Sequence, residues 1–184
     1  MQKKRITEEK AREFYEHFKT PAHVIGHCQG VTRTACRIAT ALNEAGASFD
    51  VPLIYGSAII HDMARTSENH QGVAADYLRR MGYEEEARIV AQHMTYNFAS
   101  TEVERLTELD LVCLGDRLVR DDKYVGLDAR MQYIIDKAKR LNPEKRWAEI
   151  ESRILEKKKL TRKLMDNIEK AIGRSIDDLM EEEW

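Results

Sequence analysis

The chain of 184 residues is long enough for one domain whose core needs no disulfide or metal staple. Its formal net charge of -2 provides no electrostatic case for nucleic acid as the main partner. With 42% hydrophobic and 34% charged residues, the composition favours amphipathic helices with narrow apolar stripes and solvated outer faces.

Apolar residues recur at steps of three and four along almost the whole chain, which predicts an all-α fold. In chain order, helices are expected over residues 7–19, 22–45, 51–64, 70–81, 84–93, 102–120, 127–141 and 144–172, with a short one from residue 175. Residues 95–100 are expected to form a loop. No β-hairpin signal stands out.

The pattern is interpreted as a single domain over residues 1–184, with a core over 22–120 and a helical C-terminal extension over 127–184. The extension is locally basic at Lys157–Lys159 and acidic at Glu181–Glu183. Its simplest interpretation is a solvated amphipathic helix packed along the domain. The alternative is a dimerisation or partner-binding arm, which would allow a homodimer.

Cysteine usage and hydropathy indicate a cytoplasmic protein. Cys28, Cys36 and Cys113 form no CxxC pair and no even disulfide framework, as in a reducing compartment. The opening MQKKRITEEK is charged and lacks the apolar stretch of a secretory signal. No apolar run approaches the roughly 20 residues that a membrane-spanning helix needs, so we expect no membrane partner.

Six potential metal ligands lie on successive predicted helices or at their ends: His27, His61, Asp62, His70, His93 and Asp116. His27 and Asp116 share the apolar stripes of their helices, and His61-Asp62 directly follows Ala58-Ile59-Ile60. A carboxylate on a buried stripe is costly unless a cation or a charged hydrogen-bond partner compensates it. A divalent metal ion accounts for two such carboxylates beside four histidines.

Each of these residues alone has a simpler interpretation. A single histidine on an apolar stripe is usually a core residue with a satisfied hydrogen bond. Asp116 has its own candidate partners, namely Arg33, Arg37 and Arg117. His23, four residues before His27, is a rival ligand or a neighbour of the ligands, whereas His17 is expected to play no part in the site. Because all six residues lie on inward faces or at helix ends, a shared metal site is a better interpretation than six separate structural roles.

The order His…His-Asp…His…His…Asp resembles the HD superfamily of metal-dependent phosphohydrolases. The matching segments are residues 27–31, 56–65, 70–75, 89–93 and 111–118, so the resemblance extends over about residues 22–120. The nearest pattern is that of the bacterial HD-type hydrolases of diadenosine tetraphosphate. Those enzymes tend to carry Thr-Gly-Arg after the fourth histidine, where this chain has Met94-Thr95-Tyr96-Asn97.

The resemblance implies an HD-domain helical bundle with two divalent ions that share the carboxylate of Asp62. The first ion would also be held by His27, His61 and Asp116. The second would also be held by His70 and His93. These ligands do not distinguish Fe, Mn, Co, Ni, Zn or Mg. The implied activity is hydrolysis of a nucleotide or another small phosphate ester or anhydride by metal-activated hydroxide.

Basic residues near the His-Asp pair are candidate substrate ligands. Arg65 follows Asp62 by three positions, and the resemblance implies that both residues are catalytic. Arg65 would clamp a phosphate oxygen. Arg120 and Lys123, just beyond Asp116, are further candidates for binding the small-molecule phosphate.

Two other functions remain open at this point. One is a regulatory HD module that binds metal or nucleotide without hydrolysis. The other is an HD-fold oxygenase that uses a di-iron pair for O₂ chemistry. Ligand identity does not separate the oxygenase from the hydrolase, because both use histidine and carboxylate.

Overall fold

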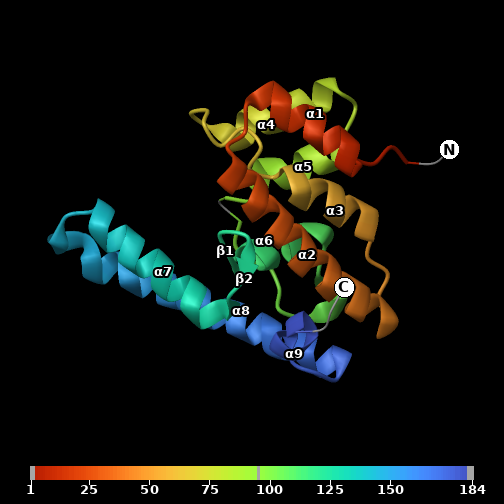
Figure 1. Cartoon of the computed structure of the whole chain (residues 1–184). Coiled ribbons are helices and arrows are strands. Elements are labelled where there is room, and N and C mark those ends of the chain that lie inside the picture. The colour runs from red at the N-terminus through yellow and green to blue at the C-terminus, as the bar shows by residue number, and fades with distance from the viewer. Residues whose placement is uncertain (1–2, 95, 182–184) are drawn as a thin grey trace.

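Helices account for almost all regular structure in the computed structural model, which describes residues 3–94 and 96–181 (Figure 1). The first five helices are α1 (Glu8–Phe18), α2 (Ala22–Glu44), α3 (Val51–Ile60), α4 (His70–Arg80) and α5 (Glu84–Gln92). They are followed by the 3₁₀ turn η1 (Val103–Arg105), α6 (Glu108–Asp116) and the strands β1 (Val119–Arg120) and β2 (Lys123–Tyr124). The chain continues through α7 (Gly126–Leu141), η2 (Glu144–Arg146), α8 (Trp147–Ile172) and α9 (Ile176–Glu181). The predicted all-α class is confirmed.

Local polar contacts explain where several helices begin. The Thr7 side chain accepts a hydrogen bond from the Lys10 backbone N–H and so caps α1. Asp50 caps α3 in the same way, through the backbone N–H of Leu53. These side chains satisfy donors that the first turn of a helix leaves unpaired.

Two apolar clusters form the core, and α3 contributes to both. Ile54 and Ala58 pack in the cluster that α2, α6 and α8 share. Ile59 and Ile60 pack in a second cluster, with α1, α4 and α5. Because α3 is apolar on all sides, it is buried inside the molecule. The residues that directly follow Ile60 are therefore buried as well.

The helix predicted over residues 102–120 is wrong at both ends. Its first part is η1, and α6 starts only after Thr107, whose backbone N–H donates to the Asp110 carboxylate at 2.7 Å. This capping arrangement begins a new helix. Past Asp116 the chain forms an antiparallel hairpin, in which Val119 pairs with Tyr124. The helix predicted to reach Ala64 also stops earlier, at Ile60, and continues as turns.

The hairpin lies against α2 because α2 carries a glycine at the contact. A Cβ atom on Gly30 would lie only 2.7 Å from the backbone oxygen of Asp122. The backbone at the hairpin tip is unusual, since Asp121 has a φ of 53°. Aspartate tolerates this left-handed conformation better than most residues.

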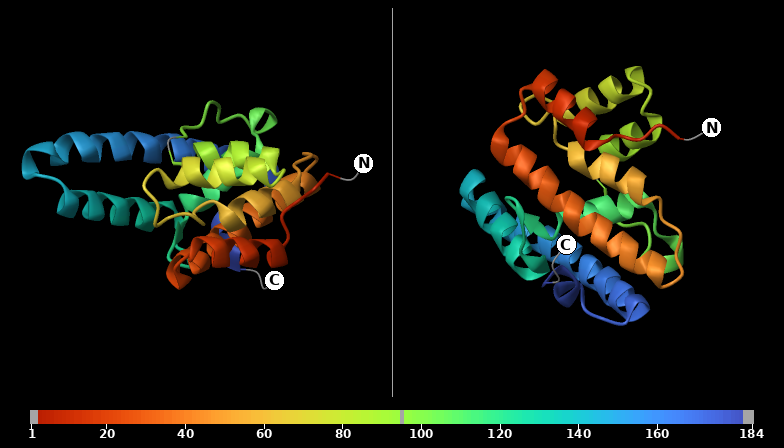
Figure 2. Two further views of the ribbon diagram at one scale, coloured as in Figure 1. Left: turned by 90° about the horizontal axis from the view of Figure 1, so that it is seen from above. Right: turned by 45° about the vertical axis from the view of Figure 1, so that its right-hand side comes forward.

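Helices α7 and α8 run side by side as an arm that projects from the rest of the bundle (Figures 1 and 2). The C-terminal part of α8 returns to the body, where Leu164, Met165 and Ile168 are buried in the core. Leu141 and Leu155, on the projecting part, are exposed. In the part of the chain that the structure describes, no helix is long and apolar enough to cross a membrane. Thr95 in the predicted loop, and Glu182 and Glu183 in the acidic end, lie outside the described residues.

Candidate metal centre

The fold gathers the six predicted ligands from five places in the chain. His27 lies in α2, and Asp116 is the last residue of α6. The remaining four are His61 and Asp62 in the turn after α3, His70 at the start of α4, and His93 directly after α5. His61, Asp62 and His93 are buried, with at most 8% of each residue exposed.

Asp62 lies at the centre of the histidines. Its Oδ1 atom is 3.2 Å from His70 Nε2 and 3.3 Å from His93 Nε2. Its Oδ2 atom is 3.9 Å from His61 Nε2. On the other side of His61, His27 Nε2 lies 3.0 Å from Asp116 Oδ1.

Two overlapping groups have donor atoms close enough to share one ion. In each group all ligand atoms lie within 4.8 Å of one another. One group is His27, His61 and Asp116, and the other is His61, Asp62 and His93. These buried groups could therefore hold a metal ion. His70 lies at the edge of the second group, with its ring centroid 5.7 Å from that of His93.

Backbone carbonyls orient the buried histidine rings. The Nδ1 atoms of His61 and His93 each lie 2.7 Å from a carbonyl oxygen, of Ala58 and Val90 respectively. A carbonyl only accepts, so each Nδ1 carries the proton and donates it. In a neutral ring the Nε2 lone pair then points to the site, as in histidines that bind metals.

Two of these Nε2 atoms lack a hydrogen bond. Among the described residues, neither His61 Nε2 nor His93 Nε2 has a hydrogen-bond partner, although both are fully buried. Burial lowers the pKa of His61 to about 4, so its ring is neutral near pH 7. A buried lone pair that faces carboxylates is unfavourable unless a cation lies between them.

The two carboxylates are held as anions. Burial raises the pKa of Asp62, but His93, His61 and Arg65 outweigh it, and the net pKa lies well below the usual range. Burial likewise raises the pKa of Asp116, but the hydrogen bond with His27 and the nearby His61 and Arg130 side chains outweigh it, and the net pKa lies below the usual range. Imidazole nitrogens and ionised carboxylates together are a donor set that first-row divalent ions favour. The residues present therefore fit a metal.

The centre opens into a cavity of about 310 Å³. Arg65 lies at its edge, where Nη1 is 3.4 Å from Asp62 Oδ1 and 3.2 Å from His70 Nε2. Arg120 and His23 also line the cavity, as the sequence pattern allowed. His23 belongs to neither of the groups that could share an ion.

Sequence reasoning missed the wall that α7 contributes, which consists of Arg130, Tyr133 and Lys137. Arg130 Nη2 lies 3.7 Å from Asp116 Oδ1, so Arg130 is the cation beside this carboxylate. Spacings of three and four residues place all three side chains on one face of a helix. That spacing is visible in the sequence, but it does not say what the face packs against.

The arginines proposed as alternative partners of Asp116 are engaged elsewhere. Arg33 donates to the Asp122 carbonyl, and Arg37 donates to the Met180 carbonyl. Arg117 donates to the Tyr96 carbonyl at 2.8 Å. The simpler interpretation of Asp116, as the partner of one of these arginines, does not account for its position.

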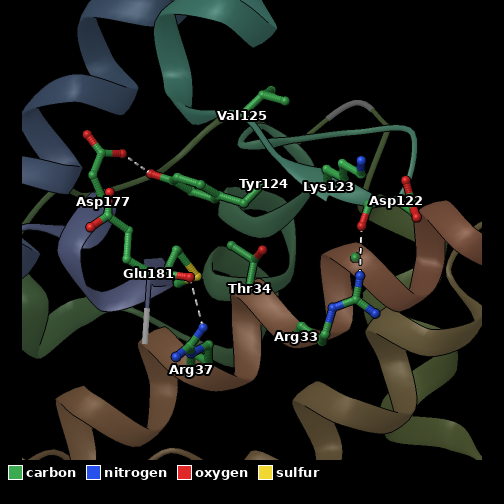
Figure 3. A pocket seen from close by; sticks show the side chains of 11 residues that line it. Arg33, Thr34, Arg37, Asp122, Lys123, Tyr124, Val125, Asp177 and Glu181 are labelled. Atoms are coloured by element: carbon green, nitrogen blue, oxygen red, sulfur yellow. Dashed lines mark hydrogen bonds between the residues drawn. The ribbon is translucent and has the colours of Figure 1, made fainter. Parts of the chain in front are cut away.

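Lys123 does not line the cavity beside the metal centre. It lines a separate cavity of about 780 Å³ between α2, the hairpin and α9 (Figure 3). Arg120, its direct partner in the hairpin, lines the cavity at the metal centre instead. His17, expected to lie outside the site, stacks on Tyr77 with ring centroids 4.6 Å apart.

Fold and site together define an all-α protein with a buried histidine–aspartate centre. The chain is 30% identical over 121 residues to the uncharacterized protein MJ0778 of Methanocaldococcus jannaschii. The match covers 58% of this chain and 72% of the relative, so the chain belongs to the same family as that protein. No family model matches the chain, and no solved structure matches it significantly.

Proposed function

We propose that the chain is a metal-dependent phosphohydrolase of the HD superfamily, which cleaves an ester or anhydride bond of a nucleotide or another small phosphate. The observation that carries the proposal is the pair of buried Nε2 atoms on His61 and His93. Both face Asp62, and both rings are held with Nδ1 as the donor. A cation would satisfy both nitrogens and the carboxylate at once.

The residues that would hold two ions follow from the two groups. His27, His61, Asp62 and Asp116 would hold one, and Asp62 and His93 the other, with His70 beside them. When bound, two divalent ions would supply activation of water and neutralisation of the phosphate oxygens. In hydrolysis the water oxygen forms a bond to phosphorus, the bond from phosphorus to the leaving oxygen breaks, and that oxygen ends with a proton.

The side chains around the centre favour a phosphate over O₂ as the reactant. Arg65 is 40% exposed at the cavity edge, where its guanidinium can bind a non-bridging phosphate oxygen. Arg120 and Arg130 line the same cavity. Several cations around a metal centre stabilise a transition state that carries negative charge, as phosphoryl transfer does.

The test is a metal and substrate survey of the whole chain. The protein is purified without added metal, its bound metal is determined, and a panel of phosphate esters and anhydrides is assayed with Mn and Fe. We expect bound first-row metal and hydrolysis that a chelator abolishes. Bound metal without any hydrolysis would favour the regulatory module, and O₂ consumption by an iron form would favour the oxygenase.

A further inference from the structure

The cavity beside the metal centre contains more basic than acidic side chains. The basic ones are Arg65, Arg120, Arg130 and Lys137, and the acidic ones are Asp62, Asp116 and Asp121. Asp62 and Asp116 both belong to the groups that could hold a metal ion. Bound cations would take up the charge of these two carboxylates, so the basic side chains would need a ligand with several negative charges.

The basic side chains come from two separate parts of the fold. Arg65 belongs to the turn after α3 and lies beside Asp62. Arg120, on β1, lies over the ring of Tyr133, with its guanidinium carbon 4.3 Å from the ring centroid. Arg130 lies near the same ring, at 5.7 Å. One tyrosine therefore lies beside two guanidinium groups, in the same cavity as the phosphate clamp that Arg65 would provide.

Arg120, Arg130 and Lys137 differ in how far neighbouring residues engage them. Arg130 is close to Asp116, with Nε 3.4 Å from the backbone oxygen. Besides its contact with the Tyr133 ring, Arg120 has a loose ion pair with Asp121, in which Nε lies 3.6 Å from Oδ2. Lys137 forms no hydrogen bond or ion pair with any residue that the structure describes. Arg120 and Lys137 thus remain available to a ligand.

We propose that Arg120, Arg130 and Lys137 form a second phosphate subsite beside the metal centre, to which β1 contributes Arg120 and the C-terminal extension contributes Arg130 and Lys137. The substrate class would be compounds with at least two phosphate groups, of which one reacts at the metal centre and the other binds at this subsite. Paired phosphates supply the several charges that the cavity requires. The inference rests on the proposed function, because it takes the metal centre as the place where the first phosphate binds.

The size of the cavity agrees with this substrate class. A volume of about 310 Å³ is at the small end of ligand sites, so it suits phosphate groups rather than a whole nucleotide. Any remaining part of the substrate would extend past the exposed side chains of Arg120 and Lys137. The subsite would therefore select for the number of phosphates and not for the group attached to them.

Binding of uncleavable probes tests the subsite. Metal-loaded protein is titrated with methylphosphonate and with bisphosphonates that have one-carbon and three-carbon linkers, and its metal content is checked afterwards. We expect at least one bisphosphonate to bind about tenfold or more tightly than methylphosphonate. In the double variant Arg120→Ala plus Lys137→Ala this margin should fall to about twofold, with the metal content unchanged.

Arg140→Ala is the matched control, because Arg140 is an exposed cation of α7 that does not line the cavity. The Arg140→Ala variant should keep the tighter binding of bisphosphonate over methylphosphonate. A variant with Arg120→Ala and Lys137→Arg should recover part of the margin that the double alanine variant loses. Equal binding of all probes to the parent protein would overturn the subsite, as would equal losses in the double variant and the control. The margin supports the subsite even if no phosphate is hydrolysed, which would count against the proposed function alone. Hydrolysis without the margin would refute the subsite alone.

Discussion

The Nδ1 atom of His27 lies 3.1 Å from the backbone oxygen of Asp121, at the tip of the β1–β2 hairpin. A hydrogen bond to this carbonyl leaves Nε2 directed at Asp116, 3.0 Å away. The hairpin thus orients a predicted ligand from outside the centre. Outer partners of this kind fix the tautomer of a metal-binding histidine.

Gly30→Ala should weaken metal binding without changing any ligand. The added Cβ would lie 2.7 Å from the Asp122 oxygen, so the hairpin must move away from α2. The Asp121 carbonyl would then move away from His27. We expect metal affinity to fall by about tenfold or more, in the range for lost outer partners of a ligand. Calorimetric titration with Mn or Zn measures the change.

Gly26→Ala is the matched control on the same helix. A Cβ at Gly26 would lie 3.4 Å from the Asp122 Cβ, which is ordinary contact. Alanine favours helix over glycine by about 1 kcal/mol, so this variant should be as stable as the parent or more stable. The role given to the hairpin is wrong if both variants bind metal as the parent does.

Asp62→Ala should abolish both metal binding and any hydrolysis. Asp62 is the carboxylate that lies within 4 Å of His61, His70 and His93 alike. His17→Ala, in contrast, should leave both properties unchanged, because His17 is an exposed residue of α1 whose ring stacks on Tyr77. Metal analysis and a hydrolysis assay check both variants. Metal content in the Asp62 variant equal to that of the parent would refute the assignment.

The number of ions tests the two histidines that follow Asp62. His70→Ala plus His93→Ala should lower the metal content from about two ions per chain toward about one, held by His27, His61, Asp62 and Asp116. The variant should also lose most hydrolysis, since one of the two charges that activate water is gone. A content near one in both proteins would contradict the two-metal model.

Metal affinity should fall as the pH falls. Burial lowers the pKa values of His27 and His93, but the neighbouring carboxylates outweigh it and raise both above the usual 6.5. The protonated rings cannot bind metal, so protons compete as the pH falls through these values. Asp62 and Asp116, whose pKa values are lowered, stay ionised in this range.

Titrations between about pH 8 and about pH 6, in buffers with different heats of ionisation, measure both the affinity and the protons released. We expect weaker binding and more protons released per ion at the lower pH. Equal affinity across this range would show that neither raised histidine binds the ion.

Much of the fold and of the centre's residues could be predicted from the sequence, because both depend on local rules. Apolar residues at steps of three and four predicted the helices of the core. The position of His61-Asp62 directly after Ile59-Ile60 indicated a buried polar pair. The start of α6 also has a local signal, since Thr107 and Asp110 have the spacing of a capping pair. Such signals act within one turn of helix and need no knowledge of packing.

The tertiary structure alone decided how these residues are oriented and what surrounds them. The carbonyls of Ala58, Val90 and Asp121 set which nitrogen of each histidine faces the centre, and a backbone oxygen has no signature in sequence. Arg130 is 14 residues beyond Asp116 in the sequence, and it reaches that carboxylate because α7 packs beside the hairpin. The types of metal ligand follow from residue identity. The histidine tautomers, the wall that α7 adds to the cavity and the charges beside the ligands follow from contacts between distant segments, which no local pattern specifies.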